Sequence, residues 1–359
     1  MRTKLAALAA AVGLWTGLAP AHDVTEGMKK GSPELKSISA LAFGPHGVLF
    51  IGDSTAGVIH AVATGDTKST GKDAVDFDKL DTTAADMLGA KAGDVTVNDV
   101  KVNPASGNVY VAVTRKGMGG GSAILKLGRD KKLTEFPLKD VMMSSVTLAN
   151  ATSNQRQRAD AITSMAFVND KLVVAGLSNE EFASTLRTLP FPFKDADKGT
   201  GVEIFHAAHN KLETNSPIRT FTPYQIAGAD YLIASYTCTP LVRVPVSDLK
   251  DGAKIKGTTV AELGNRNRPL DIIVYSKDGK DYALMANNAR GVMKITLTGI
   301  DKAEAITKGV GGGGTAGVEF ETVKDLKDVV QLDRLDDKRA IVVIDGKDKG
   351  MSVKTIDLP

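Results

Sequence analysis

The fold is decided by residues 38–62, which read Ile38-Ser-Ala-Leu-Ala-Phe43, a turn from Gly44 to Gly47, Val48-Leu-Phe-Ile51, and, after a loop, Gly57-Val-Ile-His-Ala-Val62. Short apolar runs joined by glycine-containing polar turns are typical of antiparallel strands. The three runs therefore predict three neighbouring strands of one antiparallel sheet.

The same pattern recurs five times, with first strands near Asp99, Ile162, Tyr224, Leu270 and Val329. The residues just before the second strands are Gly47, Asn108, Asp170, Asp230, Asp281 and Arg339, at spacings of 61, 62, 60, 51 and 58 residues. Six similar units indicate a closed array. We therefore predict an all-β fold, a six-bladed β-propeller with short helical insertions, in which residues 22–359 form a single domain. A seventh blade is left open, within Leu133–Asn150 or around Gly309–Thr322, and Glu34–Ser37 are the candidate for completing the last blade.

Two stretches, Leu41–Asp53 and Arg268–Gly279, resemble the repeat of the NHL, YVTN and gluconolactonase-like propellers. The resemblance covers most of the chain as a pattern and implies an exported bacterial propeller. That group includes lactonases, lyases and binding modules, so the resemblance implies an architecture and no particular activity. Gluconolactonase-like enzymes use a Glu, Asn and Asp metal set on inner strands, and no Glu matches at the start of an inner strand here.

The N-terminus is typical of an export signal. Arg2 and Lys4 supply positive charge, Leu5–Leu18 form an apolar run, and Ala19-Pro-Ala21 is a small-residue cleavage site. We therefore expect residues 1–21 to be a signal peptide cleaved after Ala21, and the protein to be periplasmic or secreted. The apolar run is too short for a stable membrane anchor, so the protein is not expected to be membrane-embedded.

Charge excludes one class of partner. Without Arg2 and Lys4 the chain has 43 basic and 42 acidic side chains, a net charge of +1. This balance lacks the electrostatic footprint of a nucleic-acid-binding protein.

Cys238 is the one cysteine, and its neighbourhood is that of a strand end rather than of a reactive thiol.

Ligand sites of propellers lie over the central channel. The top face carries the loops before the innermost strands and the loops between second and third strands. Polar residues predicted for this face are Asp53, Asn98, Arg156, Arg158, Asp160, Arg268, Asn287, Asn288 and Arg290. We expect these residues to bind the ligand.

Asp99 and Asp271 share a register at the starts of the inner strands of blades two and five. Three blades apart in a ring of six, they are expected to face each other across the channel. Carboxylates and carboxamides converging there suit Ca²⁺. The other interpretation, that these side chains only hold loop backbone, is also open.

Insertions interrupt the repeat. Residues Asp81–Ala92 predict a short helix, and Ser178–Arg187 predict a helix that ends at the apolar segment Leu189–Phe193. That segment is expected to pack against the propeller. Glu203, His206 and His209 are spaced like metal ligands, but on a strand Glu203 and His206 point to opposite faces, which argues against a metal site. Gly117–Gly121 and Gly311–Gly314 are expected to be loops.

The favoured function is a non-catalytic binding or interaction module, expected to be monomeric, that takes an unknown small molecule or an envelope protein. Leu189–Phe193 is the candidate apolar contact for such a protein. The alternative is a Ca²⁺-dependent lactonase-like hydrolase or a propeller-type sugar or alcohol dehydrogenase that uses a quinone. In that case Asp99, Asp271, Asn98 and Asn287 hold the ion, and Arg158 or Arg268 is the electrophile.

Overall fold

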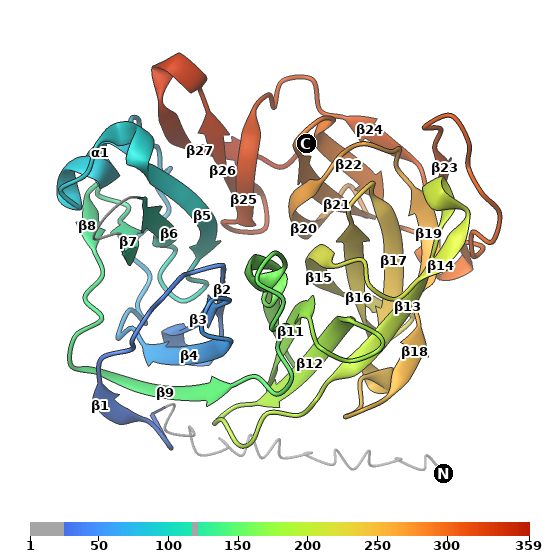
Figure 1. Ribbon diagram of the computed structural model, residues 1–359. Coiled ribbons are helices and arrows are strands. Elements are labelled where there is room, and N and C mark those ends of the chain that lie inside the picture. Colours follow the sequence, from blue (N-terminus) through green and yellow to red (C-terminus); the bar gives the residue numbers. More distant parts are fainter. Residues whose placement is uncertain (1–24, 117–120) are drawn as a thin grey trace, which may run out of the picture.

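The computed structural model describes residues 25–116 and 121–359. The predicted signal peptide and most of the Gly117–Gly121 loop lie outside these residues. Six sheets, antiparallel except for one outer pair of strands, stand around a central axis (Figure 1), so the prediction of a six-bladed all-β propeller is confirmed. Among the described residues, no helix has the length and apolar character needed to cross a membrane.

Each blade starts at the centre of the ring and is numbered here in chain order. The innermost strands are β2 (Ala40–Phe43), β5 (Val95–Val102), β10 (Ser164–Val168), β15 (Ile218–Ile226), β20 (Pro269–Lys277) and β25 (Val329–Arg334). The second strands are β3 (Val48–Asp53), β6 (Val109–Arg115), β11 (Lys171–Leu177), β16 (Ala229–Tyr236), β21 (Lys280–Asn287) and β26 (Arg339–Asp345). The third strands are β4 (Val58–Ala63), β7 (Ser122–Leu127), β12 (Ser184–Pro190), β17 (Pro240–Pro245), β22 (Gly291–Thr296) and β27 (Met351–Asp357).

The outer parts of the blades are less regular. The outer strands are β9 (Val141–Thr147), β8 (Leu133–Glu135), β13 (Thr200–His206), β19 (Thr258–Glu262) and β24 (Phe320–Thr322), with the short edge strands β1 (Lys29–Gly31), β14 (Lys211–Glu213), β18 (Lys254–Lys256) and β23 (Ala316–Gly317). One α-helix, α1 (Leu80–Met87), and seven 3-10 turns complete the described residues: η1 (Pro45–Gly47), η2 (Ala92–Asp94), η3 (Arg158–Asp160), η4 (Ala207–His209), η5 (Val246–Asp248), η6 (Ile300–Lys302) and η7 (Lys347–Lys349). The short helix expected within Asp81–Ala92 is thus confirmed.

The second strands are almost continuously apolar because both faces of a blade are covered. In β3, Leu49 packs with Tyr110 of blade 2, whereas Phe50 packs with Leu172 of blade 3. Successive side chains of a strand point to opposite faces, so each neighbouring blade receives every second residue. The core of the protein is therefore six apolar layers between blades.

The blades do not follow one another around the ring in chain order. Strand β2 lies beside β5 and β10, and β25 lies beside β5 and β20. The apolar layers agree, because one joins blade 2 to blade 6 and another joins blade 1 to blade 3. The ring order is blade 2, 1, 3, 4, 5, 6 (Figure 1). The expectation that Asp99 and Asp271 face each other three blades apart is therefore wrong, since only blade 6 separates blades 2 and 5.

This order follows from the path of the chain after blade 2. The chain returns to blade 1, where β9 pairs with β4 as its outer strand, before it enters blade 3 (Figure 1). The stretch Leu133–Asn150 therefore supplies outer strands of blades 1 and 2. Likewise, Gly309–Thr322 supplies the edge strands β23 and β24 of blades 4 and 5. Neither stretch is a seventh blade.

Blade 6 is completed from the segment between blades 1 and 2. The backbone N–H of Phe77 donates to Val353 O at 2.9 Å, and the N–H of Val353 donates to Phe77 O at 2.8 Å. The expectation that Glu34–Ser37 close the last blade is wrong: Lys36 N–H donates to Asp53 Oδ2 at 2.6 Å, so that segment belongs to blade 1.

The prediction of a helix over Ser178–Arg187 is also wrong. Strand β12 pairs with β11 along its whole length, from Leu177 opposite Ser184 to Lys171 opposite Pro190. The buried strand β11 needs a hydrogen-bonded neighbour, and this tertiary demand overrides the local capping pattern. The apolar segment does pack against the propeller as expected, because Phe191 and Phe193 lie with ring centroids 5.1 and 5.9 Å from that of Phe50.

Candidate functional site

A cavity of about 860 Å³ lies at the centre of the ring. Innermost strands of all six blades line it, through residues that include Phe43, Lys101, Phe167, Phe221, Asp271 and Asp333. The mouth of the cavity lies on the bottom face of the ring, where the turns between innermost and second strands lie. Two residues of such a turn, Asp336 and Asp337, line it. The volume is typical of small-molecule sites, which measure about 300–1,000 Å³.

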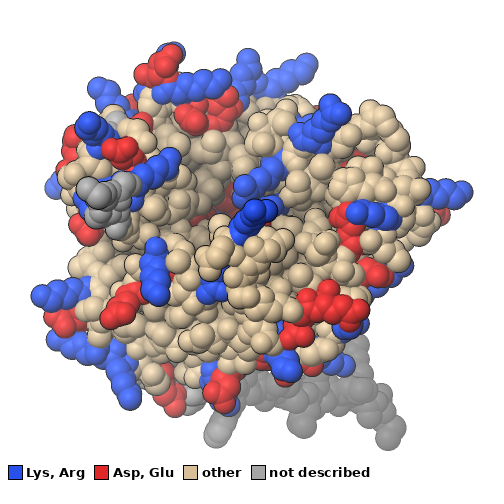
Figure 2. Space-filling view, in the orientation of Figure 1, with Lys and Arg blue, Asp and Glu red and all other residues tan. Residues whose placement is uncertain are grey.

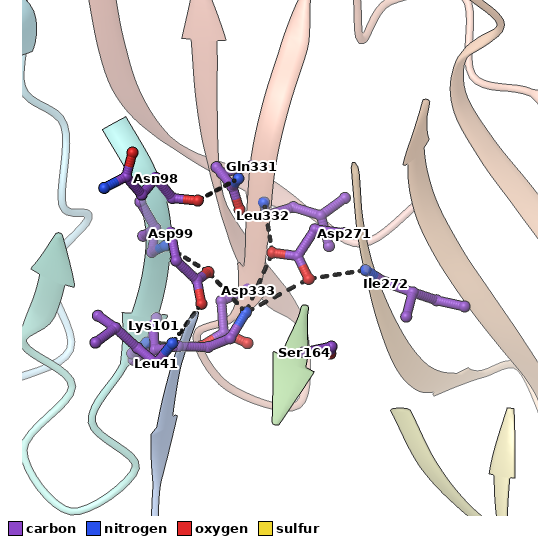
Figure 3. Close-up of polar contacts among 12 residues, drawn as sticks. Leu41, Asn98, Asp99, Lys101, Ser164, Asp271, Ile272, Gln331, Leu332 and Asp333 are labelled. Atoms are coloured by element: carbon purple, nitrogen blue, oxygen red, sulfur yellow. Dashed lines mark hydrogen bonds and ion pairs between the residues drawn. The ribbon is translucent and has the colours of Figure 1, made fainter. Parts of the chain in front are cut away.

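At the base of the cavity, Lys101 of β5 lies between two carboxylates (Figure 3). Its Nζ is 3.3 Å from Asp99 Oδ1 and 3.2 Å from Asp271 Oδ2. The structure thus brings together the two residues predicted to bind Ca²⁺, but an ammonium group occupies the place between them. Calcium binding there stays a prediction, and it requires displacement of Lys101.

Asp99, Asp271 and Asp333 of β25 form, with Lys101, an acidic cluster whose carboxylates connect neighbouring blades. Each accepts a hydrogen bond from a backbone N–H on the innermost strand of an adjacent blade: Leu41 N to Asp99 Oδ2 at 2.7 Å, Val102 N to Asp333 Oδ2 at 2.6 Å, and Leu332 N to Asp271 Oδ2 at 3.4 Å. The cluster therefore has a structural role in holding blades 1, 2, 6 and 5 together.

The cluster carries more acid than base. Burial, together with the charges of Asp99 and Asp333, raises the pKa of Asp271 to about 7 against the opposing effect of Lys101. Burial also raises the pKa of Asp333. Burial alone would lower the pKa of Lys101, but the three carboxylates, Asp271 first, hold it above its usual value. At neutral pH the ammonium is thus charged, while Asp271 titrates.

The whole cavity shares this acidic character. Its charged lining residues are five aspartates and two basic residues: Asp230, Asp271, Asp333, Asp336, Asp337, Lys101 and Arg334. The side chains of Phe167 and Phe221 form an apolar part of the cavity wall. A positively charged ligand with an apolar part matches this lining better than an anion does.

The ligand residues predicted for the top face lie on the face of the ring opposite the mouth of the cavity. The carboxylate of Asp53 is fully buried and accepts hydrogen bonds from Lys36 N, Ser37 Oγ and Ala56 N at 2.6, 2.7 and 2.9 Å. Asn98 Nδ2 donates to Ile38 O at 2.8 Å. Asp53 therefore holds backbone within blade 1, and Asn98 connects blade 2 to the backbone that precedes β2 of blade 1.

Two other predicted residues, Asp160 and Arg268, lie near Arg219, and Asn288 holds the backbone of Arg268. Arg219 Nη1 is 2.6 Å from Asp160 Oδ1. Burial lowers the pKa of Arg268, and the charge of Arg219 lowers it further. The backbone N–H of Arg268 donates to Asn288 Oδ1 at 2.7 Å. Figure 2 shows basic side chains near the middle of the ring on this face, with acidic atoms deeper beside them.

The remaining predicted residues shape loops. Arg158 Nε donates to Thr55 O at 3.1 Å, and Arg290 Nη2 donates to Asn265 O at 3.2 Å. Asn287 Oδ1 accepts from the N–H of Arg290 at 3.1 Å. Arg156 is exposed, and its N–H donates to Asn154 Oδ1 at 3.1 Å.

Sequence reasoning missed Lys101, Asp333 and Arg219. Lys101 had a usable signal, because it follows Asp99 by two positions on a strand and so shares its face. Asp333 and Arg219 had none, since their contacts depend on which blades are neighbours.

No protein-family model and no curated protein matches this chain. Solved structures that are similar to it include a streptogramin B lyase (10% identity, TM-score 0.41, 92% of this chain and 97% of that chain). Another is virginiamycin B lyase from Staphylococcus aureus (10% identity, TM-score 0.38, 92% of this chain and 98% of that chain). A third is the PQQ-bound aldose sugar dehydrogenase from Streptomyces coelicolor (12% identity, TM-score 0.32, 92% of this chain and 96% of that chain).

At these identities the likeness concerns the fold alone. The propeller architecture that the resemblance to the NHL, YVTN and gluconolactonase-like proteins implies is confirmed by the strand topology.

Proposed function

We propose that the protein is a binding protein that takes a small organic cation in its central cavity without transforming it. The observation that carries this proposal is the base of the cavity, where Asp99 and Asp271 contact the single ammonium of Lys101 and the charge of Asp333 also acts on it. A second cation brought by the ligand would balance this excess of acid. Charge-assisted hydrogen bonds to carboxylates are among the stronger polar contacts in proteins.

The rest of the lining supports the same class of ligand. Phe167 and Phe221 offer apolar contact to the uncharged part of the molecule. Among the described lining residues Ser164 is the one serine, and the lining holds no histidine or cysteine to activate it. A serine with no histidine beside it lacks the usual activating base of a serine hydrolase, which favours binding over serine-type hydrolysis.

A matched pair of probes tests the proposal. Benzylamine and benzyl alcohol have nearly the same shape, and only benzylamine is a cation at neutral pH. We expect benzylamine to raise the melting temperature of the full chain and benzyl alcohol to leave it unchanged, because a ligand at 100 times its Kd stabilises by about 2.7 kcal/mol.

Two variants locate the binding. Asp271→Asn should remove most of the benzylamine shift, whereas Asp325→Asn, an exposed aspartate outside the cavity, should keep it. Equal shifts with both probes, or an unchanged benzylamine shift in Asp271→Asn, would contradict the proposal.

We also propose that the protein acts in the periplasm or after secretion, and that its ligand is met there. The support is the charged and apolar pattern of residues 1–21. Expression of the full chain in a Gram-negative host tests this: recovery from the periplasm with His22 as the first residue is expected. Retention in the cytoplasm with residues 1–21 intact would contradict it.

The enzymatic alternative keeps one specific observation in its favour, the raised pKa of Asp271. A buried carboxyl that titrates at about 7 suits proton transfer at neutral pH. The Ca²⁺ set proposed for it is less well supported, because Asn98 donates to Ile38 O and Asn287 Nδ2 donates to Asn267 Oδ1. A melting temperature that is the same in Ca²⁺ and in EDTA would remove the metal-dependent form of this alternative.

A further inference from the structure

We propose that His206, His209 and Cys238 form a transition-metal site of the two-histidine, one-cysteine type that takes Zn²⁺. The site lies where the outer strand of blade 3 meets blade 4. His206 ends β13, His209 ends η4, and Cys238 is in the turn between β16 and β17. One ligand atom of each residue lies within 4.8 Å of the others, so small side-chain movements bring all three onto one ion.

Both imidazoles are oriented by one carboxylate. Glu213 Oε2 is 2.7 Å from His206 Nδ1, and Glu213 Oε1 is 2.7 Å from His209 Nδ1. When Nδ1–H donates to a carboxylate, the lone pair of the ring is on Nε2. This carboxylate–histidine arrangement is the usual support of histidine metal ligands.

His206 Nε2 has no hydrogen-bond partner among the described residues, although the side chain is only 1% exposed. Buried polar atoms are normally paired, and an unpaired one costs about 1–3 kcal/mol. A bound ion would satisfy this atom. His209, with a side chain 46% exposed, leaves the site open to solvent.

Backbone contacts hold the ligands in place. Glu262 is fully buried, and its Oε2 accepts a hydrogen bond from the N–H of Ala208, between the two histidines, at 3.1 Å. The N–H of Cys238 donates to Asn267 O at 2.8 Å. Cys238 has a φ of 63°, a conformation that turns usually assign to Gly or Asn. A strained position held by a cysteine is consistent with a role for its thiol.

The ligand types favour Zn²⁺. Imidazole and thiolate bind this ion well, and three protein ligands leave a fourth position of the tetrahedron for water. Binding replaces the S–H bond of Cys238 by an S–Zn bond and releases one proton. The site is separate from the acidic cluster around Lys101. The sequence pattern with Glu203 did not predict it, because Cys238 comes from the next blade.

Metal titration of the full chain tests the proposal. We expect wild type to bind one equivalent of Zn²⁺ by calorimetry, and Co²⁺ to give a thiolate-to-cobalt charge-transfer band in the near ultraviolet. Cys238→Ser should abolish that band, and His206→Gln should weaken Zn²⁺ binding by at least about 100-fold, since each removes a ligand. His46→Asn, which changes an exposed histidine of blade 1, should bind like wild type.

Two further measurements separate binding from misfolding. Because Cys238 is the single cysteine, alkylation by iodoacetamide reports on it alone, and one equivalent of Zn²⁺ should block the reaction in wild type. Glu213→Gln should keep the charge-transfer band and weaken Zn²⁺ binding about 10- to 100-fold. Wild type without stoichiometric Zn²⁺ binding, Co²⁺ binding without the thiolate band, or alkylation at the same rate with and without Zn²⁺ would overturn the proposal. A copper-type visible band with Cu²⁺ and no binding of Zn²⁺ would also overturn it.

Discussion

Replacement of Lys101 by methionine removes the ammonium group from the acidic cluster and keeps the apolar stem. The ammonium lies 3.2 and 3.3 Å from Asp271 and Asp99, and the lysine side chain is only 19% exposed. Removal of one partner from a buried ion pair costs about 3–5 kcal/mol. We expect a loss of this size in the free energy of unfolding at pH 8.

The loss should be smaller at low pH. The pKa of Asp271 is about 7 in the folded wild type, and without Lys101 it should rise further. In the unfolded chain an aspartate titrates near 3.9, so between pH 5 and 8 the folded variant binds more protons than the unfolded one. Its stability therefore falls as pH rises, by up to about 1.4 kcal/mol per unit for one proton. At pH 5 we expect the loss to be smaller by at least about 1 kcal/mol.

Urea unfolding followed by circular dichroism at pH 5 and pH 8 measures both values. Lys132→Met is the matched control, because that side chain is 79% exposed and its Nζ is 3.9 Å from Asp130 Oδ2. The control should change stability by less than about 0.5 kcal/mol. A Lys101→Met loss below about 1 kcal/mol at both pH values, or the same loss at both, would show that Lys101 does not balance the buried charge of Asp271.

Three further outcomes are expected. Asp271→Asn should flatten the fall in wild-type stability between pH 5 and pH 8, because the group with the raised pKa is removed; urea titrations that keep the wild-type slope would contradict this. Gly176→Ala should cost more than about 3 kcal/mol, because the added Cβ would lie 2.0 Å from Ala161 O, while Gly311→Ala, with nothing within 4 Å, should cost less than about 1 kcal/mol in the same assay. Arg187→Met should change stability by less than about 1 kcal/mol or stabilise, because this fully buried guanidinium leaves Nε and Nη1 without partners among the described residues; a loss above about 3 kcal/mol would contradict that account.

The repeat could be predicted from sequence because each blade has a local signature. Strand pairs such as Leu49 opposite Phe43 are joined by turns of a few residues, so their composition reveals them. The ring order could not be predicted. The ring order depends on the pairing of β9 with β4, in which Val146 lies opposite Ile59. All of blade 2 lies between these two residues in the sequence. A repeat pattern shows how many blades there are but not which of them are neighbours.

The candidate site could likewise be predicted only in part. Asp99 and Asp271 were identified as channel residues, and the alternation of the strand could have added Lys101. The position of Asp333 beside them required the ring order. His206 and Cys238 are 32 positions apart in different blades, so no spacing rule could have joined them.

The affinity for benzylamine, measured at pH 6 and pH 8, shows whether the acidic base of the central cavity binds an organic cation. Benzylamine stays a cation between pH 6 and pH 8, while Asp271, with a pKa of about 7, goes from mostly protonated to mostly ionised. If the ligand binds the ionised carboxylate, calorimetry should show about tenfold tighter binding at pH 8 than at pH 6. The same Kd at both pH values, or equal affinity for benzyl alcohol, would contradict the claim that the acidic base of the central cavity binds an organic cation.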